Sequence, residues 1–124
     1  MPHIDDIYLG NPILKKANTE IEFTQEQILE FVKCKDDPVY FAKKYIKIVS
    51  LDEGLVPFDL YPFQEKLIRN FHEERFNICK MPRQTGKSTT CVSYLLHYAL
   101  FNDNVNIAVL ANKASTARDL LGRL

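Results

Sequence analysis

The stretch Met81-Pro82-Arg83-Gln84-Thr85-Gly86-Lys87-Ser88 decides the fold that we expect for this chain. It follows an alternating polar and apolar run at 75–80, which predicts a strand, and it precedes an apolar-rich run at 87–101, which predicts a helix. A strand that turns into a helix gathers backbone N–H groups at the helix start, where the helix dipole adds roughly half a positive charge. The pattern therefore predicts a loop that binds phosphate groups.

The residue types in this loop suit ATP with Mg²⁺. Gly86 lets the backbone approach the phosphates closely, and Lys87 brings a positive charge to the β- and γ-phosphates. The hydroxyl of Ser88 is an expected ligand of Mg²⁺. The expected nucleotide-binding set in the loop and the first helical turn is completed by Gln84, Thr85 and Thr89.

The loop departs from the usual phosphate-binding pattern at its first residue. That pattern places a glycine five residues before Gly86, where this sequence has Met81 followed by Pro82. Pro82 donates no N–H and forces the residue before it into an extended conformation. We therefore expect the phosphate-binding amides to begin at about Gln84.

The sequence after the expected helix predicts a second strand and a further helix. Asn102-Asp103-Asn104 breaks the helix, 105–110 is a continuous apolar run, and 114–124 has a helical pattern. Strand, helix and strand in this order build a parallel sheet with a right-handed crossover. We therefore expect an α/β fold in which the apolar helix 87–101 is buried against a parallel sheet.

The sequence before the loop predicts helices. Thr24-Gln25-Glu26-Gln27 has the form of a capping box before a helix at about 25–35. Asp37-Pro38 is a second helix start, and Pro62 opens a third helix that ends near 72–74. Between the last two helices, 46–49 reads as a short β-like run before a turn at 52–54.

These elements divide the chain into three expected parts. Residues 1–23 read as a poorly ordered N-terminal arm, 24–74 as a helical lead-in, and 75–124 as the start of a nucleotide-binding core. The Lys43, Lys44 and Lys47 patch on the second helix reads better as a solvated face than as a nucleic-acid footprint.

The composition is that of an ordinary globular chain. Sixteen Lys and Arg balance sixteen Asp and Glu, so the overall charge gives no reason to expect tight nucleic-acid binding by this segment alone. Three widely spaced cysteines without a CxxC motif favour reduced thiols in a cytosol-like compartment. No apolar run approaches the length of a membrane span, and the three scattered histidines suggest no catalytic arrangement.

The loop resembles the variant phosphate-binding loop of the large terminase subunit, the DNA-packaging ATPase of tailed bacteriophages, particularly of the T4-like group. The shared form is Arg83-Gln84-x-Gly86-Lys87-Ser88. Further matching blocks lie at 37–42, 46–50, 60–64 and 109–113, and the N-terminal arm is unmatched. The resemblance implies a partial RecA-like ATPase fold preceded by a helical segment, located in the host cell cytoplasm.

The resemblance also implies roles for particular residues. Gln64 corresponds to the family's adenine-recognising glutamine, and Phe63 would pack beside the base. Arg83 corresponds to an arginine that acts on the γ-phosphate during catalysis, together with Lys87. Without the resemblance, Gln64 reads as an exposed helix residue and Arg83 as the partner of a carboxylate.

In the full family protein, ATP hydrolysis drives double-stranded DNA into a prohead. The implied partners are the DNA, the portal protein and the small terminase subunit, with the motor acting as a homo-oligomeric ring. The family also has an acidic pair at the end of a later strand and a C-terminal nuclease, and we find neither in this sequence. We therefore expect little ATP turnover from this chain alone.

Two other interpretations stay open. A superfamily 2 helicase or restriction translocase also places a glutamine-bearing segment before such a loop. A non-catalytic nucleotide-binding or adaptor fragment would instead bind partners through its helical portion. ATP binding that depends on Lys87 separates the motors from an adaptor that does not bind nucleotide.

Overall fold

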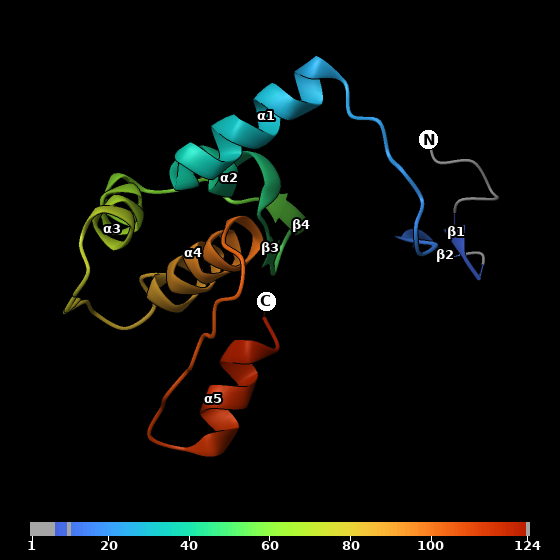
Figure 1. Cartoon of the computed structure of the whole chain (residues 1–124). Helices are drawn as coiled ribbons and strands as arrows, with labels where there is room; N and C mark the ends of the chain where they lie inside the picture. The colour runs from blue at the N-terminus through green and yellow to red at the C-terminus, as the bar shows by residue number, and fades with distance from the viewer. Residues whose placement is uncertain (1–6, 10, 124) are drawn as a thin grey trace.

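Helix α2 (Pro38–Tyr45) lies between three other helices and brings them together (Figure 1). It packs against α1 (Gln25–Asp36), α3 (Pro62–Glu73) and α4 (Lys87–Phe101), and α3 also packs directly on α4. The computed structural model describes residues 7–9 and 11–123. The expected arm at residues 1–6 and 10, and the last residue of the expected helix 114–124, lie outside the described residues.

The structure confirms the predicted starts of the first two helices. Thr24 and Gln27 form the predicted capping box of α1, in which each side chain bonds to the other residue's backbone N–H. Asp37 accepts hydrogen bonds from the N–H groups of Val39 and Tyr40 at 3.0 and 3.1 Å, with Pro38 in the first turn of α2.

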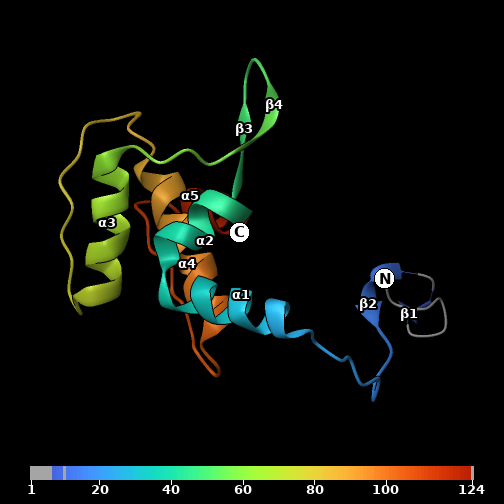
Figure 2. The same ribbon diagram turned by 90° about the horizontal axis from the view of Figure 1, so that it is seen from above.

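Two antiparallel hairpins contain the strands that the structure describes. Strand β3 (Lys47–Ser50) pairs with β4 (Gly54–Pro57) across the predicted turn, and this hairpin projects from the helices (Figure 2). Near the N-terminus, β1 (Ile7–Tyr8) pairs with β2 (Asn11–Lys15) at a distance from the other elements.

The core is small and lies where α2, α3 and the segment after β4 meet. Ile68 of α3 is fully buried, in contact with a cluster that Ile46, Ile48 and Tyr94 cover from outside. The other buried members of this cluster are Val39, Ala42, Phe58 and Leu60. The residues between the hairpin and α3 therefore belong to the core and tie α3 to α2.

Polar contacts join α1 to α2. The Glu30 carboxylate accepts hydrogen bonds from the Tyr40 hydroxyl at 3.0 Å, the Lys44 ammonium at 2.6 Å and the Tyr45 hydroxyl at 2.8 Å. Hydrogen bonding from Lys44, followed by that from Tyr45, lowers the pKa of Glu30 to about 2. Two lysines of the predicted solvated patch are thus paired, because Lys43 also forms an ion pair with Glu65 of α3.

The predicted parallel sheet is wrong. Residues 75–80 and 105–110 form no strand in the described structure, which contains two antiparallel two-stranded sheets and no RecA-like parallel sheet. A strand is held by ladder hydrogen bonds to a neighbour, and neither segment has one. Their large apolar side chains face solvent: Phe76, Ile78 and Leu110 are 82%, 101% and 90% exposed. Apolar patterning predicted the extended shape of these segments but supplied no partner.

The predicted burial of α4 is also wrong in its detail. Its buried side chains are polar, namely Thr90, Ser93 and His97, while Leu100 is exposed. His97 donates from Nε2 to the carbonyl oxygen of Cys34 at 2.8 Å, which fixes α4 to the end of α1. Burial lowers the pKa of His97, which favours its neutral form. The two buried hydroxyls bond to carbonyl oxygens at the start of α4 itself, Thr90 to Gly86 and Ser93 to Thr90, so they are buried with a partner.

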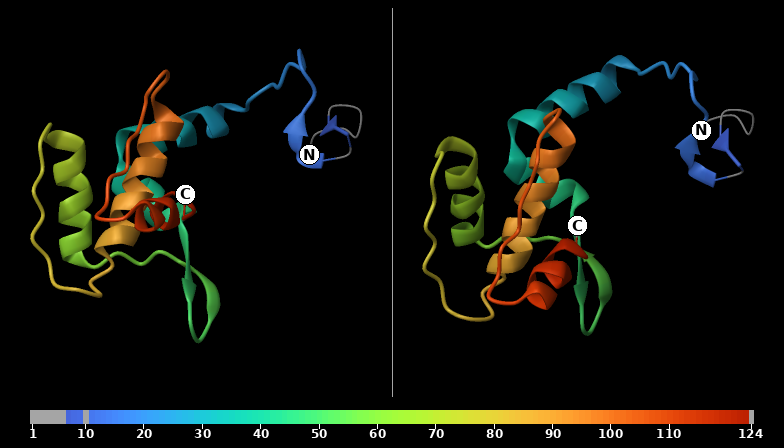
Figure 3. Two further views of the ribbon diagram at one scale, coloured as in Figure 1. Left: turned by 90° about the horizontal axis from the view of Figure 1, so that it is seen from below. Right: turned by 60° about the horizontal axis from the view of Figure 1, so that its bottom comes forward.

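Helix α5 (Ala114–Leu121) follows the second extended segment and lies against α4, below the other helices in the view of Figure 1. It begins where the sequence predicted. After α5 the chain approaches the β3–β4 hairpin (Figure 3). Arg123 lines the same cavity as Ile46 and Ile48.

Candidate phosphate-binding site

Helix α3 and the start of α4 position the loop 81–86. The two helices pack together, and the chain leaves the end of α3, runs back beside it and turns into α4 at Gly86 (Figure 3). Gly86 precedes the helix with a φ of 70°, and Gln84 has a φ of 60°. Both are in the left-handed region, which side chains other than glycine rarely adopt.

The loop backbone has the geometry of an anion-binding nest. Left-handed residues at 84 and 86 alternate with Thr85, which lies outside that region, and with the helical Lys87. Alternation of this kind turns successive N–H groups toward one concave side. The N–H groups of residues 87–89 have no acceptor within the helix, because they belong to its first turn. This surface can therefore donate several hydrogen bonds to one anion.

The two cations of the loop are exposed. Lys87 extends back along the loop and its Nζ makes a long contact of 3.5 Å with the carbonyl oxygen of Met81. Arg83 makes no hydrogen bond or ion pair with any of the described residues. Its expected alternative role, pairing with a carboxylate, is therefore not seen in this part of the chain.

Gln64 reaches the loop from the first turn of α3. Its Nε2 donates to the carbonyl oxygen of Thr85 at 3.2 Å, and its Oε1 accepts from the N–H of Tyr61 at 2.9 Å. Sequence patterning suggested an exposed residue, but the side chain is buried. The structure thus brings Gln64 to the loop 81–86, with both ends of its amide bonded within the protein. The resemblance implied instead that this amide reads an adenine base.

An aromatic pair adjoins this contact. The rings of Tyr61 and Phe63 lie parallel, with centroids 5.8 Å apart and an interplanar angle of 6°, and both side chains are exposed. Because Gln64 is the next residue, this pair lies at the end of α3 that touches the loop. Exposed aromatic faces of this kind stack with any nucleobase.

Thr90 supports the loop, and the sequence analysis missed it. This fully buried threonine donates from Oγ1 to the carbonyl oxygen of Gly86 at 2.8 Å, while its own N–H donates to the same oxygen at 2.9 Å. A threonine four residues after Gly86 was the available signal, since Thr hydroxyls in helices commonly bond to the carbonyl four residues back.

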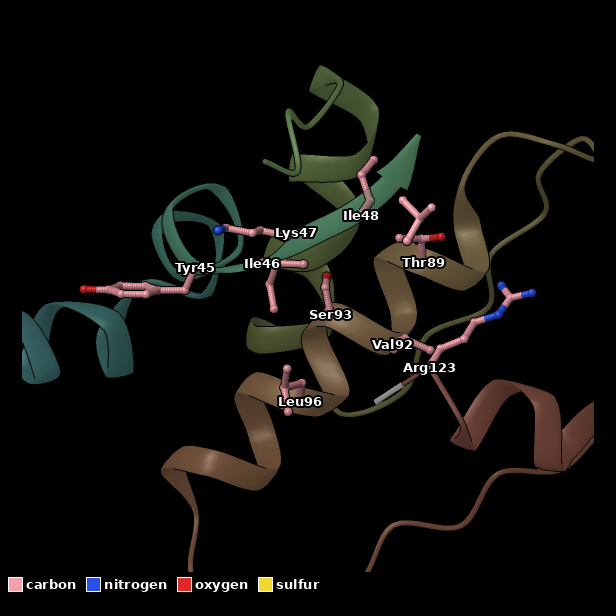
Figure 4. A pocket seen from close by; sticks show the side chains of 10 residues that line it. Tyr45, Ile46, Lys47, Ile48, Thr89, Val92, Ser93, Leu96 and Arg123 are labelled. Carbon is pink, nitrogen blue, oxygen red and sulfur yellow. The ribbon is translucent and has the colours of Figure 1, made fainter. Parts of the chain in front are cut away.

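The remaining predicted residues face cavities with mainly apolar walls. Ser88 and Lys87 line a cavity of about 280 Å³ together with Cys79, Cys91 and Val109. Thr89 lines a larger cavity of about 620 Å³ between α4 and β3, where Ile46, Ile48, Ser93 and Leu96 also point (Figure 4). Apolar walls do not solvate a polyphosphate, so the exposed concave side of the loop is the better phosphate site.

The described part of the chain contains no ready-made metal site. Over residues 7–9 and 11–123, no three His, Cys, Asp or Glu side chains gather as a metal site. A Mg²⁺ ion at Ser88 would take most of its ligands from phosphate and water, as Mg²⁺ does in nucleotide sites. No helix within these ranges has the length and apolar character needed to cross a membrane.

The three cysteines are free. No model of a known protein family matches the sequence.

Proposed function

We propose that this chain binds ATP through the loop 81–88, as the nucleotide-binding part of a viral DNA-packaging motor of the large terminase type. One observation carries the ATP-binding proposal: the alternating left-handed residues Gln84 and Gly86 lead into the start of a 15-residue helix beside Lys87. The proposal rests on this loop and on the sequence resemblance. It takes no support from a parallel sheet.

The loop residues have distinct tasks in this proposal. The N–H groups from Gly86 to Thr89 hold the phosphate oxygens, and Lys87 swings from the Met81 carbonyl to the β- and γ-phosphates. Mg²⁺, bound by Ser88, would neutralise charge on the phosphates. Arg83, exposed and unpaired in the described part, places a planar cation beside the γ-phosphate. The Tyr61–Phe63 pair offers a face for the base.

The proposed partners follow from the resemblance. They are double-stranded DNA, the portal protein and the small terminase subunit, met by a homo-oligomeric ring in the host cytoplasm. The balanced charge of the chain gives no electrostatic reason for tight DNA binding by this segment alone, so a DNA contact within it would have to be local.

Titration with Mg-ATP tests the ATP-binding proposal. Lys87→Ala should weaken binding roughly 10- to 100-fold, because it removes a charged hydrogen bond to phosphate. Lys80→Ala is the matched control, since it removes an equally exposed lysine of the segment before the loop and should leave affinity unchanged. The ATP-binding proposal is wrong if the native chain binds no ATP, or if both variants bind like the native chain.

Arg83 is tested in a complete motor that contains this sequence. Arg83→Ala should lower the turnover number strongly while changing ATP affinity little, because the charge that it stabilises develops during phosphoryl transfer. Equal losses of turnover and affinity would assign Arg83 to ground-state binding instead.

A further inference from the structure

The amide of Gln64 contacts one peptide group of the phosphate loop. The hydrogen bond from Nε2 to the Thr85 carbonyl joins residues 21 apart in the chain, and the side chain is 3% exposed. Its oxygen is already bonded to the N–H of Tyr61. Reading a base edge would need the same oxygen and nitrogen to face a ligand. In this arrangement both atoms face the protein.

The contact links the loop to the rest of the fold by a side-chain hydrogen bond. The other side-chain hydrogen bonds of the loop stay within residues 81–90: Thr85 to the Pro82 carbonyl, Lys87 to Met81, and Thr90 to Gly86. Among the described residues, Gln64 is the side chain that hydrogen-bonds to the loop from outside this range. This amide is therefore the side-chain hydrogen bond by which α3 holds the loop, in addition to the packing of α3 on α4.

Peptide geometry explains what the contact does. A trans peptide is planar, so the carbonyl of Thr85 and the N–H of Gly86 point in opposite directions. No cis peptide occurs among the described residues. When Gln64 holds the Thr85 carbonyl, the Gly86 N–H is directed away from α3. The hydrogen bond thus selects one orientation for an N–H of the nest.

The same contact explains the glycine. A Cβ atom at residue 86 would lie 2.6 Å from the Nε2 of Gln64, closer than non-bonded atoms approach, and it would also be strained by the φ of 70°. Glycine at 86 is what allows the amide to reach Thr85. Gln64 and Gly86 therefore depend on each other for this contact.

We propose that Gln64 is a positioning residue that aims the Gly86 N–H at bound phosphate by holding the Thr85 carbonyl, and that it does not read the base. This inference rests on the proposed phosphate binding by the loop. Because the contact acts on the phosphate end of the ligand, its loss weakens the binding of ATP, GTP and inorganic tripolyphosphate by the same factor.

The test compares Gln64→Met with Gln27→Met. Both glutamines accept a hydrogen bond from the N–H of the residue three positions earlier, at the start of α3 and α1 respectively. Gln27 does not touch the loop, so Gln27→Met controls for the loss of a helix cap. Binding of Mg-ATP, Mg-GTP and tripolyphosphate with Mg²⁺ is measured by calorimetry for both variants and the native chain.

Gln64→Met should weaken all three ligands roughly tenfold, the value of one hydrogen bond of about 1.4 kcal/mol, and Gln27→Met should weaken none. Loss of ATP binding with GTP and tripolyphosphate unchanged would show that Gln64 reads the base and would overturn the proposal. Unchanged binding of all three would also overturn it. If the native chain binds none of them, the ATP-binding proposal itself fails.

A second variant covers the case in which Gln64→Met does not fold. Gln64→Glu keeps an oxygen for the Tyr61 N–H but replaces the donor to Thr85 by an oxygen, so it retains the cap and loses the loop contact. Far-UV circular dichroism establishes folding. The expected result is the same parallel loss over the three ligands; native affinity for tripolyphosphate in this variant would contradict the positioning role.

Discussion

Helices α1 to α4 and the extended segments 75–80 and 105–110 were all predicted from patterning, yet only the helices formed as expected. A helix closes its hydrogen bonds within its own residues, and its ends are completed by neighbours such as Thr24 and Asp37. A strand needs a second strand, and local sequence supplies one only where a turn joins the two strands, as between β3 and β4. The loop 81–86, which joins the extended segment 75–80 to α4, is therefore held by the helices α3 and α4 and not by a strand.

The largest expected effect contrasts a core residue with an exposed one. Ile68→Ala should lower the free energy of unfolding by about 2–5 kcal/mol, because Ile68 is fully buried against α2 and the segment after β4. Ile78→Ala, in the first extended segment, should change it by less than about 0.5 kcal/mol, since this side chain is fully exposed. Denaturant unfolding measures both. A similar loss from the two substitutions would mean that residues 75–80 are packed in solution.

An intermediate effect isolates the local signals of the helices. Asp37→Ala should cost about 1 kcal/mol, because Asp37 accepts two N–H bonds at the start of α2. Asp36→Ala removes an adjacent exposed carboxylate that makes no cap, and is expected to be nearly neutral. Equal changes would indicate that charge, and not capping, stabilises this helix junction.

The smallest effect concerns the polar contact between α1 and α2. The folded-state pKa of Glu30, about 2, lies below its ordinary value of 4.5, so its contribution is complete above that ordinary value and is lost as the pH falls toward 2. Glu30→Gln should be less stable than the native chain near neutral pH, and this difference should shrink over that window. The effect is small because both side chains of the Glu30–Lys44 pair are partly exposed.

Unfolding measured from pH 6 to pH 2 for the native chain and Glu30→Gln tests this last expectation. The control is Glu26→Gln, which changes an exposed carboxylate in the first turn of α1 without such partners. A constant difference between Glu30→Gln and the native chain across the range would show that ionisation of Glu30 does not contribute.

Part of the candidate site could be predicted and part could not. Lys87 and Ser88 lie at the start of a helix, and this boundary could be predicted because Gly86 and the residues that follow it are local signals of a helix start. The bond from Gln64 to Thr85 joins residues far apart in the sequence, so no pattern within either segment specifies its geometry. The buried support from Thr90 escaped notice because hydroxyl residues in helices are common and usually exposed.

The sequence by itself determined the helix boundaries and the β3–β4 hairpin, because caps, prolines and turn residues act over a few positions. It also determined that the loop has a glycine at residue 86, where the backbone is left-handed. The tertiary structure alone decided that Gln64 meets the loop, that α4 buries Thr90, Ser93 and His97, and that 75–80 and 105–110 have no strand partner within the described residues. These outcomes depend on which surfaces come into contact, and packing between segments that are distant in the sequence decides which surfaces do so.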